Sequence, residues 1–436
     1  MKQAYINGII LDGTKDMEPQ QNKVILTDGE RIEAIVEKEQ IKDKDLSGYE
    51  IVDLAGNYIM PGLINLHLHL PATGRPTKKQ QDAAKLVKIL TSNALFRKLA
   101  MNMCESSART QLLSGVTTIR TVGGVLDFDS KIRNKINAGE TVGPRILSCD
   151  MAVSVEGGHM AHSLAYVANS AEEAASYVRK IAEAKPDWIK LMITGGVLDA
   201  KVKGEPGELK MPPEYVKAAC DAAHELGLKV AAHVESPEGV KCALANGVDS
   251  IEHGAAADEE MIALFKEHHA CLIATISPAL PYAKFDREIS NITETEQYNG
   301  QVVFNGILNC AKACLANDIP VGLGTDTGCP YITHYDMWRE LNYYHNYCGV
   351  SEKFALYTAT KLNAELAGIG DITGSIEPGK CADFVVTKQN PLENLQALRK
   401  IEMVVTRGKV IDHPTVKKMP EVEKKLDKFL NDSTER

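Results

Sequence analysis

The hydrophobic pattern divides the middle of the chain, residues 61–375, into short apolar runs and longer amphipathic segments. The longer segments, such as Pro213–Leu226, Asp258–Glu267 and Gln297–Ala316, have the spacing typical of surface helices. Strands that alternate with helices indicate a parallel sheet covered by helices. From the apolar runs we predict eight strands, namely Leu63–Leu70, Val116–Val122, Arg145–Cys149, Trp188–Ile193, Lys229–Val234, Ser250–His253, Cys271–Ile276 and Val321–Asp326.

The count of eight favours an α/β fold of the (β/α)8 TIM-barrel type. Eight strand–helix units spread over roughly 300 residues fit such a barrel with loop insertions. A doubly wound open sheet is the competing architecture, but the chain lacks a Gly-x-Gly-x-x-Gly turn after a strand. We therefore predict a barrel over residues 61–375.

Both ends of the chain contain short apolar runs separated by turn residues. Asn7-Gly8 and Asp28-Gly29 lie between such runs, and both pairs signal a hairpin because they tolerate positive φ. Similar runs lie near residues 382–386, 403–405 and 407–411. Because residues 1–60 are too few for a comfortable domain, we predict that they pair with residues 376–412 in one small β-sandwich domain. Residues 413–436 would form a charged C-terminal tail.

The first predicted barrel strand carries two histidines on one face. Side chains alternate along a strand, so His67 and His69 point the same way while Ile64, Leu66 and Leu68 point to the other face. Two neighbouring imidazoles on a rigid strand suit a divalent metal such as zinc. The pair alone does not establish a metal site, because two histidines in a half-polar strand without a metal would show the same pattern.

Four other predicted strands carry a polar residue within or at the end of an apolar run. They are Lys190, His233, His253 and Asp326, and Asp326 follows two glycines that leave space beneath it. Catalytic groups of a (β/α)8 barrel lie at the C-terminal ends of its strands. Each residue alone has an ordinary explanation, such as a loop cap or a lysine that reaches solvent. Together on five strands they indicate an active site.

Composition and charge narrow the class of function. The chain has 49 Lys and Arg against 58 Asp and Glu, a formal net charge of −9, and no concentrated basic stripe. This argues against a nucleic acid or an anionic membrane as a partner. No run is long and apolar enough to span a bilayer, and the first residues lack the apolar core of a secretion signal. The 10 cysteines are scattered, which fits reduced thiols. We expect a cytoplasmic enzyme with a small-molecule substrate, and a homo-oligomer remains open.

These residues bring the chain close to a known family. The pattern of His67-x-His69, Lys190, His233, His253 and Asp326 resembles the metal-dependent amidohydrolase superfamily over essentially the whole chain. Within it, the chain is similar to the Xaa-Pro dipeptidase (prolidase)-like and imidazolonepropionase-related branch. The stretches that carry this likeness are Gly115–Thr118, Gly143–Arg145, Lys190–Val197, Ile251–Gly254, Gly324–Gly328, Thr358–Lys361 and Gly374–Asp383.

The resemblance implies a two-metal site for hydrolysis of an amide bond. His67, His69 and Asp326 would hold one divalent ion and His233 and His253 the other, and the family pattern indicates zinc. Lys190 would bridge the two as an N-carboxylated lysine, since a plain ammonium has no lone pair to offer a metal. The nucleophile would be a hydroxide between the metals, and Asp326 would take its proton and pass it to the leaving amine. The expected substrate is a dipeptide or an N-acyl amino acid.

Two further residues receive roles from the resemblance. His159, in a Gly-Gly-His loop, is expected to contact the substrate carbonyl and to take part in catalysis, although a surface histidine is the plain alternative. Arg120 is a candidate partner for a substrate carboxylate, as are the lysines of the loop Gly195–Met211, which is a lid or an insertion without function. The sequence departs from this branch at Asn65 and Thr121, where many members have Asp.

Two other functions remain open at this point. A mononuclear deaminase or cyclic-amide hydrolase on the same scaffold would use a strand-five acid, which His233-Val234-Glu235 faintly suggests, but it would leave Lys190 without a role. A non-catalytic barrel is the third alternative, and the complete set of ligands argues against it. The number of metal ions per chain, two, one or none, separates the three.

Overall fold

A computed structural model describes residues 1–41, 46–76 and 82–433. The chain forms two compact units. The first unit contains residues 1–65, 109–119 and 335–436, and the second contains residues 66–108 and 120–334. These units are divided at other residues than the domain boundaries that we predict at residues 60, 375 and 412. Those boundaries stay a prediction.

The eight predicted barrel strands are all present among the described residues. A three-stranded sheet has the order β7-β8-β9, and β12 to β16 follow one another in a second sheet with parallel pairing. The bounds are β7 (Leu63–Leu68), β8 (Val116–Thr121), β9 (Arg145–Leu147), β12 (Trp188–Met192), β13 (Lys229–Val234), β14 (Ser250–His253), β15 (Cys271–Ala274) and β16 (Val321–Leu323).

Backbone hydrogen bonds join the two sheets into a closed ring. On one side, the Trp188 amide donates to the Ser148 carbonyl over 3.1 Å, next to β9. On the other side, the Asp326 amide donates to the His67 carbonyl over 2.8 Å, and a parallel bridge pairs Leu68 with Thr327. The (β/α)8 prediction is therefore confirmed, and the strand ends after β7, β12, β13, β14 and β16 meet at one end of the ring.

Two strands that the sequence did not predict follow β9. They are β10 (Ala152–Val155) and β11 (Ala165–Ala168), which pair in parallel. β10 also pairs with β12 through Val153 and Leu191. The predicted third strand, Arg145–Cys149, corresponds to β9 beside the start of β12, and the unpredicted β10 lies beside the end of β12.

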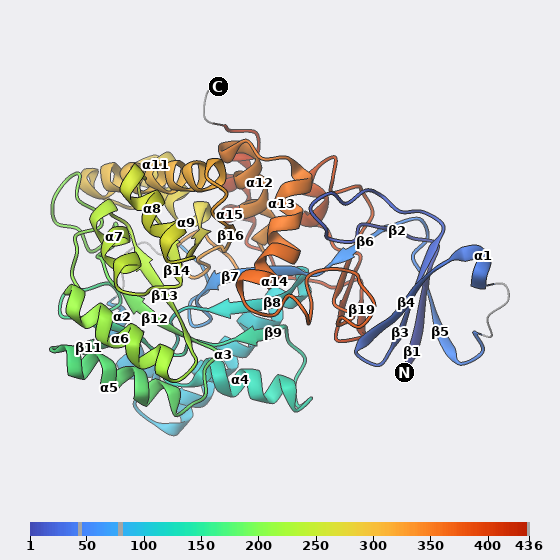
Figure 1. Cartoon of the computed structure of the whole chain (residues 1–436), viewed down its shortest axis with the longest axis horizontal. Coiled ribbons are helices and arrows are strands. Elements are labelled where there is room, and N and C mark those ends of the chain that lie inside the picture. Colours follow the sequence, from blue (N-terminus) through green and yellow to red (C-terminus); the bar gives the residue numbers. More distant parts are fainter. Residues whose placement is uncertain (42–45, 77–81, 434–436) are drawn as a thin grey trace. The chain divides into compact units, whose positions relative to one another are not determined.

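Helices flank the strands in the second unit, as Figure 1 shows for α5, α6, α7, α8 and α11. The predicted helix Asp258–Glu267 is α8, whose N-cap Asp258 accepts a hydrogen bond from the Met261 amide. The predicted helix Gln297–Ala316 begins earlier, because Thr293 and Glu296 form a capping box at its start. The helices of this part of the chain are α2 (Ala83–Leu90), α3 (Ala94–Leu113), α4 (Phe128–Asn137), α5 (Ala171–Ala182), α6 (Pro213–Glu225), α7 (Pro237–Ala245), α8 (Glu259–Glu267), α9 (Ile276–Lys284), α10 (Arg287–Ser290) and α11 (Glu294–Ala316).

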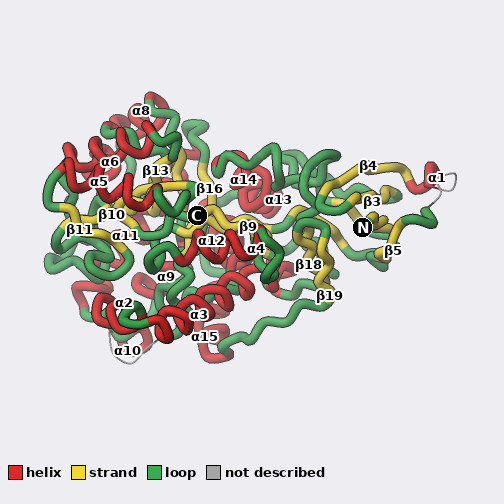
Figure 2. The backbone as a smooth tube through the Cα atoms, turned by 90° about the horizontal axis from the view of Figure 1, so that it is seen from below, coloured by secondary structure: helices red, strands yellow, loops and turns green. Residues whose placement is uncertain are grey.

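The two ends of the chain pair in the first unit, as predicted. β6 is antiparallel to β17, with Pro61 opposite Phe384, and Tyr5, Ile25, Ile59 and Phe384 share one buried core. Figure 2 shows β3, β4 and β5 gathered around the N-terminus. One sheet has the order β4-β3-β1-β5 and the other β19-β18-β17-β6-β2. The bounds are β1 (Lys2–Ile6), β2 (Ile9–Ile10), β3 (Lys23–Asp28), β4 (Arg31–Glu37), β5 (Tyr49–Asp53), β6 (Tyr58–Pro61), β17 (Phe384–Thr387), β18 (Met403–Thr406) and β19 (Lys409–Asp412).

The hairpin prediction is right at Asp28-Gly29 and wrong at Asn7-Gly8. β3 and β4 are antiparallel neighbours across Gly29, whose φ is +57°. Asn7 also has a positive φ of 56°, but β1 and β2 belong to different sheets. The turn at Asn7 therefore moves the chain from one sheet to the other, and each strand finds a more distant partner.

The remaining helices belong to the first unit. They are α1 (Lys38–Ile41), α12 (Met337–Cys348), α13 (Glu352–Tyr357), a π-helical turn (Thr358–Leu362), α14 (Asn363–Leu366) and α15 (Pro420–Leu426). Short 3-10 turns cover Leu395–Arg399 and Asp427–Phe429. Among the helices of the described ranges, none combines the length and the apolar character needed to cross a membrane.

Candidate active site

The six residues of the predicted ligand set converge at one end of the barrel. All six are buried, with exposed fractions between 1% and 8%. They lie within or just after five strands, and all belong to the second unit. The set comprises His67, His69, Lys190, His233, His253 and Asp326.

His67 and His69 both turn their Nε2 atoms toward Asp326. The distances to Asp326 Oδ1 are 3.5 Å from His67 and 3.2 Å from His69. The other nitrogen of each ring is held from behind, because His67 Nδ1 contacts Glu252 Oε2 at 2.6 Å and His69 Nδ1 contacts the Gly123 carbonyl at 2.8 Å. A partner on one ring nitrogen fixes the orientation of the other, as in histidines that bind metals.

His253 connects this group to His233. Its ring centroid lies 4.8 Å from that of His67 and 4.7 Å from that of His233. Potential ligand atoms of His67, His253 and Asp326 lie within 4.8 Å of one another, and so do those of His233, Glu235 and His253. The donor atoms thus form two adjacent groups that share His253.

Backbone geometry at the strand ends aims two of these side chains. His253 and Asp326 have φ of 70° and 50°, in the left-handed region that residues other than glycine rarely adopt. Gly324 permits close approach of the neighbouring strand, because a Cβ there would lie 2.4 Å from the Cβ of His67. The predicted space beneath Asp326 is therefore filled by β7, whose His67 packs directly against Gly324.

Lys190 lies among the histidines without a partner. Its Nζ atom is buried and has no hydrogen-bond partner among the described residues. Burial lowers the pKa of Lys190 to about 8, against the opposing effects of Glu252 and Asp326. A buried ammonium without a partner is costly, so this amine is a position where a neutral or modified group is favoured.

The chemistry of the donor set fits divalent cations. Burial lowers the pKa of His67 to about 4 and holds the pKa of His233 and His253 well below their ordinary value. The three imidazoles are therefore neutral near pH 7, which is the form that binds a metal. Asp326 adds a carboxylate at hydrogen-bonding distance from His69.

Glu252 is a buried carboxylate behind the predicted ligands that the sequence did not single out. It is fully buried, and its Oε1 accepts hydrogen bonds from Arg120 Nη2 at 2.6 Å and Ser250 Oγ at 2.5 Å. Burial opposes its ionisation, but Arg120 and His67 outweigh burial and hold the pKa of Glu252 below the ordinary carboxyl range. Its position beside His253 in the sequence was visible, but nothing local linked it to His67, 185 residues earlier.

Arg120 is placed differently from the expected substrate-binding role. Its guanidinium is 1% exposed, donates to the Leu66 carbonyl and to Glu252, and stacks over Trp188 with 4.6 Å to the ring centroid. A side chain enclosed in this way cannot also receive a substrate carboxylate. The expectation that Arg120 binds a substrate carboxylate is therefore corrected: its guanidinium binds Glu252 instead.

His159 lies at the edge of the cluster and is partly exposed. Its ring stacks on His233 with 4.2 Å between centroids and 11° between planes. Its Nδ1 contacts Asp199 Oδ2 at 2.5 Å, and the Gly196 amide donates to the same oxygen at 3.0 Å. The loop Gly195–Met211 thus holds His159 against the predicted ligands, which the sequence pattern did not indicate.

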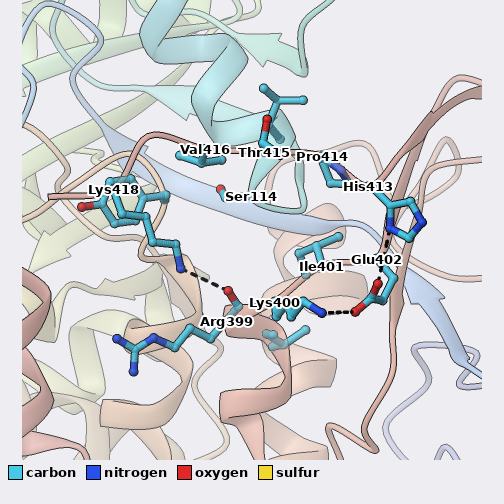
Figure 3. Close-up of a pocket in the computed structure, with 13 residues that line it drawn as sticks. Ser114, Arg399, Lys400, Ile401, Glu402, His413, Pro414, Thr415, Val416 and Lys418 are labelled. Atoms are coloured by element: carbon cyan, nitrogen blue, oxygen red, sulfur yellow. Dashed lines mark hydrogen bonds and ion pairs between the residues drawn. The ribbon is translucent and has the colours of Figure 1, made fainter. Parts of the chain in front are cut away.

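The first unit contains a separate pocket of about 300 Å³. Its charged side chains are largely paired with one another (Figure 3): Lys400 with Glu402 at 3.0 Å and His413 with Glu402 at 3.5 Å. Lys418 donates to the Arg399 carbonyl over 3.2 Å. None of the predicted site residues lines this pocket.

Known proteins share both this fold and these sequence features. Residues 58–411 match the amidohydrolase family. Ochratoxinase of Aspergillus niger is 25% identical over 424 residues, which cover 91% of this chain and 83% of that protein. A solved structure of a candidate prolidase from Bifidobacterium longum is 33% identical, with a TM-score of 0.86 and 98% of each chain covered. A Xaa-Pro dipeptidase with methionine bound in its active site is 28% identical, with a TM-score of 0.81 and coverage of 94% of this chain and 100% of that one. The chain therefore belongs to the amidohydrolase family, in its prolidase-like branch, and is a metal-dependent hydrolase that acts on carbon–nitrogen bonds.

Proposed function

We propose that this enzyme uses two divalent metal ions to hydrolyse the amide bond of a dipeptide or an N-acyl amino acid. The observation that carries the proposal is the buried amine of Lys190, which has no hydrogen-bond partner among the described residues and lies within a cluster of neutral imidazoles and one carboxylate. A one-metal site would give this lysine no role.

The proposed ligand sets are those that the family resemblance implies. His67, His69 and Asp326 would hold one ion, and His233 and His253 the other. Lys190 would bridge them after its neutral amine adds CO2, which forms an N–C bond and releases the amine proton to water. The resulting carbamate carries one negative charge shared between two oxygens, which a metal can accept as ligands. When bound, the ions, zinc in our proposal, supply activation of water and polarisation of the scissile carbonyl.

Asp326 is the proposed proton carrier. Its Oδ1 lies close to His67 and His69, and its Oδ2 accepts a weak hydrogen bond from Cys329 Sγ at 3.6 Å. From this position the carboxylate accepts a proton from the attacking water and returns it to the leaving amine. His159, held by Asp199, would orient the substrate carbonyl from the partly exposed side.

Asp326→Asn tests the assigned proton transfer. We expect turnover to be largely abolished in a variant that still folds, because an amide does not accept the proton. Metal content must be measured in the same preparation, since Asp326 is also a proposed ligand. Near-normal kcat in a metal-replete variant would remove Asp326 from the mechanism.

A free carboxylate on the leaving amino acid needs a cationic partner. With Arg120 enclosed in the barrel, Lys210 is the loop lysine that we propose. Its side chain is 25% exposed and pairs with Glu208 at 2.5 Å, and its charge also acts on Asp199, the partner of His159. Lys203 is more exposed, at 48%, and pairs with Glu294. Equal kcat/KM for an acyl amino acid and its C-terminal amide would contradict recognition of the carboxylate.

The deciding experiment combines metal analysis with a substrate library. Protein grown with zinc should contain nearly two ions per chain and should release amino acids from dipeptides or N-acyl amino acids. One tightly held ion with release of ammonia from a cyclic or amino-substituted substrate would instead support the mononuclear alternative. No bound metal and no turnover would support a non-catalytic barrel.

A further inference from the structure

Glu235 is a partly buried acidic residue next to the proposed metal ligands, and the proposed mechanism gives it no task. It directly follows β13, two residues after His233, so the alternation of the strand directs both side chains toward the same face. Ligand atoms of Glu235, His233 and His253 all lie within 4.8 Å of one another. The carboxylate is therefore within reach of any ion that the two histidines hold.

One carboxylate oxygen is engaged and the other is not. The Val197 backbone hydrogen-bonds to the carboxylate, and the Glu235 amide donates to Thr194 Oγ1 over 3.1 Å. Oε2 is buried and has no hydrogen-bond partner among the described residues. Buried polar atoms in proteins are nearly always paired, and a missing partner requires an explanation such as an ion.

The loop Gly195–Met211 holds Glu235 in this position. A Cβ on Gly207 would lie only 2.3 Å from the carbonyl carbon of Glu235, so the backbones of the loop and of the strand end are in direct contact. The loop itself is tied down, because the Gly204 amide donates to Asn299 Oδ1 over 2.7 Å and Asn299 Nδ2 donates to the Val202 carbonyl over 3.0 Å. The loop thus holds the Glu235 backbone in place, and Oε2 is enclosed within the site.

We propose that Glu235 Oε2 is a ligand of the ion held by His233 and His253. The inference rests on the metal centre of the proposed function and adds to it a carboxylate outside the predicted set of six. Two imidazoles and one carboxylate form a donor set that proteins use for zinc with a position left open. The added negative charge favours binding of a divalent cation beside a second one.

The test compares zinc affinity in the wild type, Glu235→Gln and a control, Glu238→Gln. Gln keeps the size of the side chain and removes its charge, while Glu238 is an exposed residue in the first turn of α7. Metal-free protein is titrated with zinc against a chromophoric chelator, and bound ions are counted after dialysis. We expect Glu235→Gln to bind one of the two ions about 10- to 100-fold more weakly, the range seen when groups that support a metal site are removed. The control should match the wild type.

Unchanged affinity for both ions in Glu235→Gln overturns the proposal, even if turnover falls. If the wild type binds only one ion, the two-metal function is refuted. The role of Glu235 is then decided by that one ion: weaker binding in Glu235→Gln supports it, and unchanged binding overturns it. If the variant does not fold, the structure of the zinc-loaded wild type decides. An Oε2–zinc distance of about 2.0–2.2 Å supports the proposal, and separation beyond coordination distance overturns it.

Discussion

Replacing Glu252 by Gln should cost much more stability than a surface substitution of the same kind. Glu252 is fully buried, and its two oxygens accept from Arg120, Ser250 and His67 at 2.5–2.6 Å. In Gln, one of these oxygens becomes an NH2 group, so a donor faces a donor on one side. The guanidinium of Arg120, which is 1% exposed, loses its counter-charge.

The magnitude follows from removing one partner of a buried ion pair. Such a change costs about 3–5 kcal/mol, because the remaining charge stays buried without compensation. Arg120→Met should cost a similar amount, because it leaves the carboxylate of Glu252 buried without its counter-charge. The double variant removes both charges, so its loss should be smaller than the sum of the single losses by about 0.5–3 kcal/mol.

Urea unfolding in the presence of a chelator measures these free energies without a contribution from bound metal. Glu267→Gln, at the exposed end of α8, is the matched control and should change the free energy of unfolding by less than about 0.5 kcal/mol. Zinc affinity, measured separately, should fall about 10- to 100-fold in Glu252→Gln, since His67 loses the group that orients it. If Glu252→Gln behaves like the control in both measurements, the pair does not have the role that we derive from its geometry.

Three further changes test other parts of the structure. Lys190→Ala should lose one metal ion and most turnover, and short carboxylic acids should restore part of both; a variant with two ions and normal kcat would contradict the bridge. Gly324→Ala places a Cβ 2.4 Å from that of His67 and should lower the free energy of unfolding by at least about 1–3 kcal/mol, whereas Gly48→Ala, with no atom within 4 Å of the added Cβ, should be nearly neutral. Burial, followed by repulsion from Asp150, raises the pKa of Asp129 to about 7 from an ordinary 3.8, so the stability that Asp129 contributes is fully present below about pH 3.8 and is lost as the pH rises to about 7. The side chain of Asp129→Asn stays neutral, so the melting temperature of this variant relative to the wild type should be higher at pH 9 than at pH 5. The same difference in melting temperature at both pH values would refute the assignment.

The sequence by itself determined the positions of the barrel strands and most of the helices. Hydrophobic alternation and helical spacing are properties of residues close together in the chain, so they can be recognised without knowledge of the fold. The same alternation placed His67 and His69 on one face, and the likeness to a known family added Lys190, His233, His253 and Asp326. The structure brings these six residues together at one end of the barrel.

Only the tertiary structure decided which groups support that cluster. Asn7-Gly8 carries a local turn signal, but the partners of the flanking strands were set by contacts with distant segments. Arg120 looked available for a substrate until the barrel placed it against Glu252, 132 residues away. Glu252 carried no signal in the sequence and Glu235 only a faint one, because the neighbours that give a carboxylate its role arise only when separate strands close into a ring.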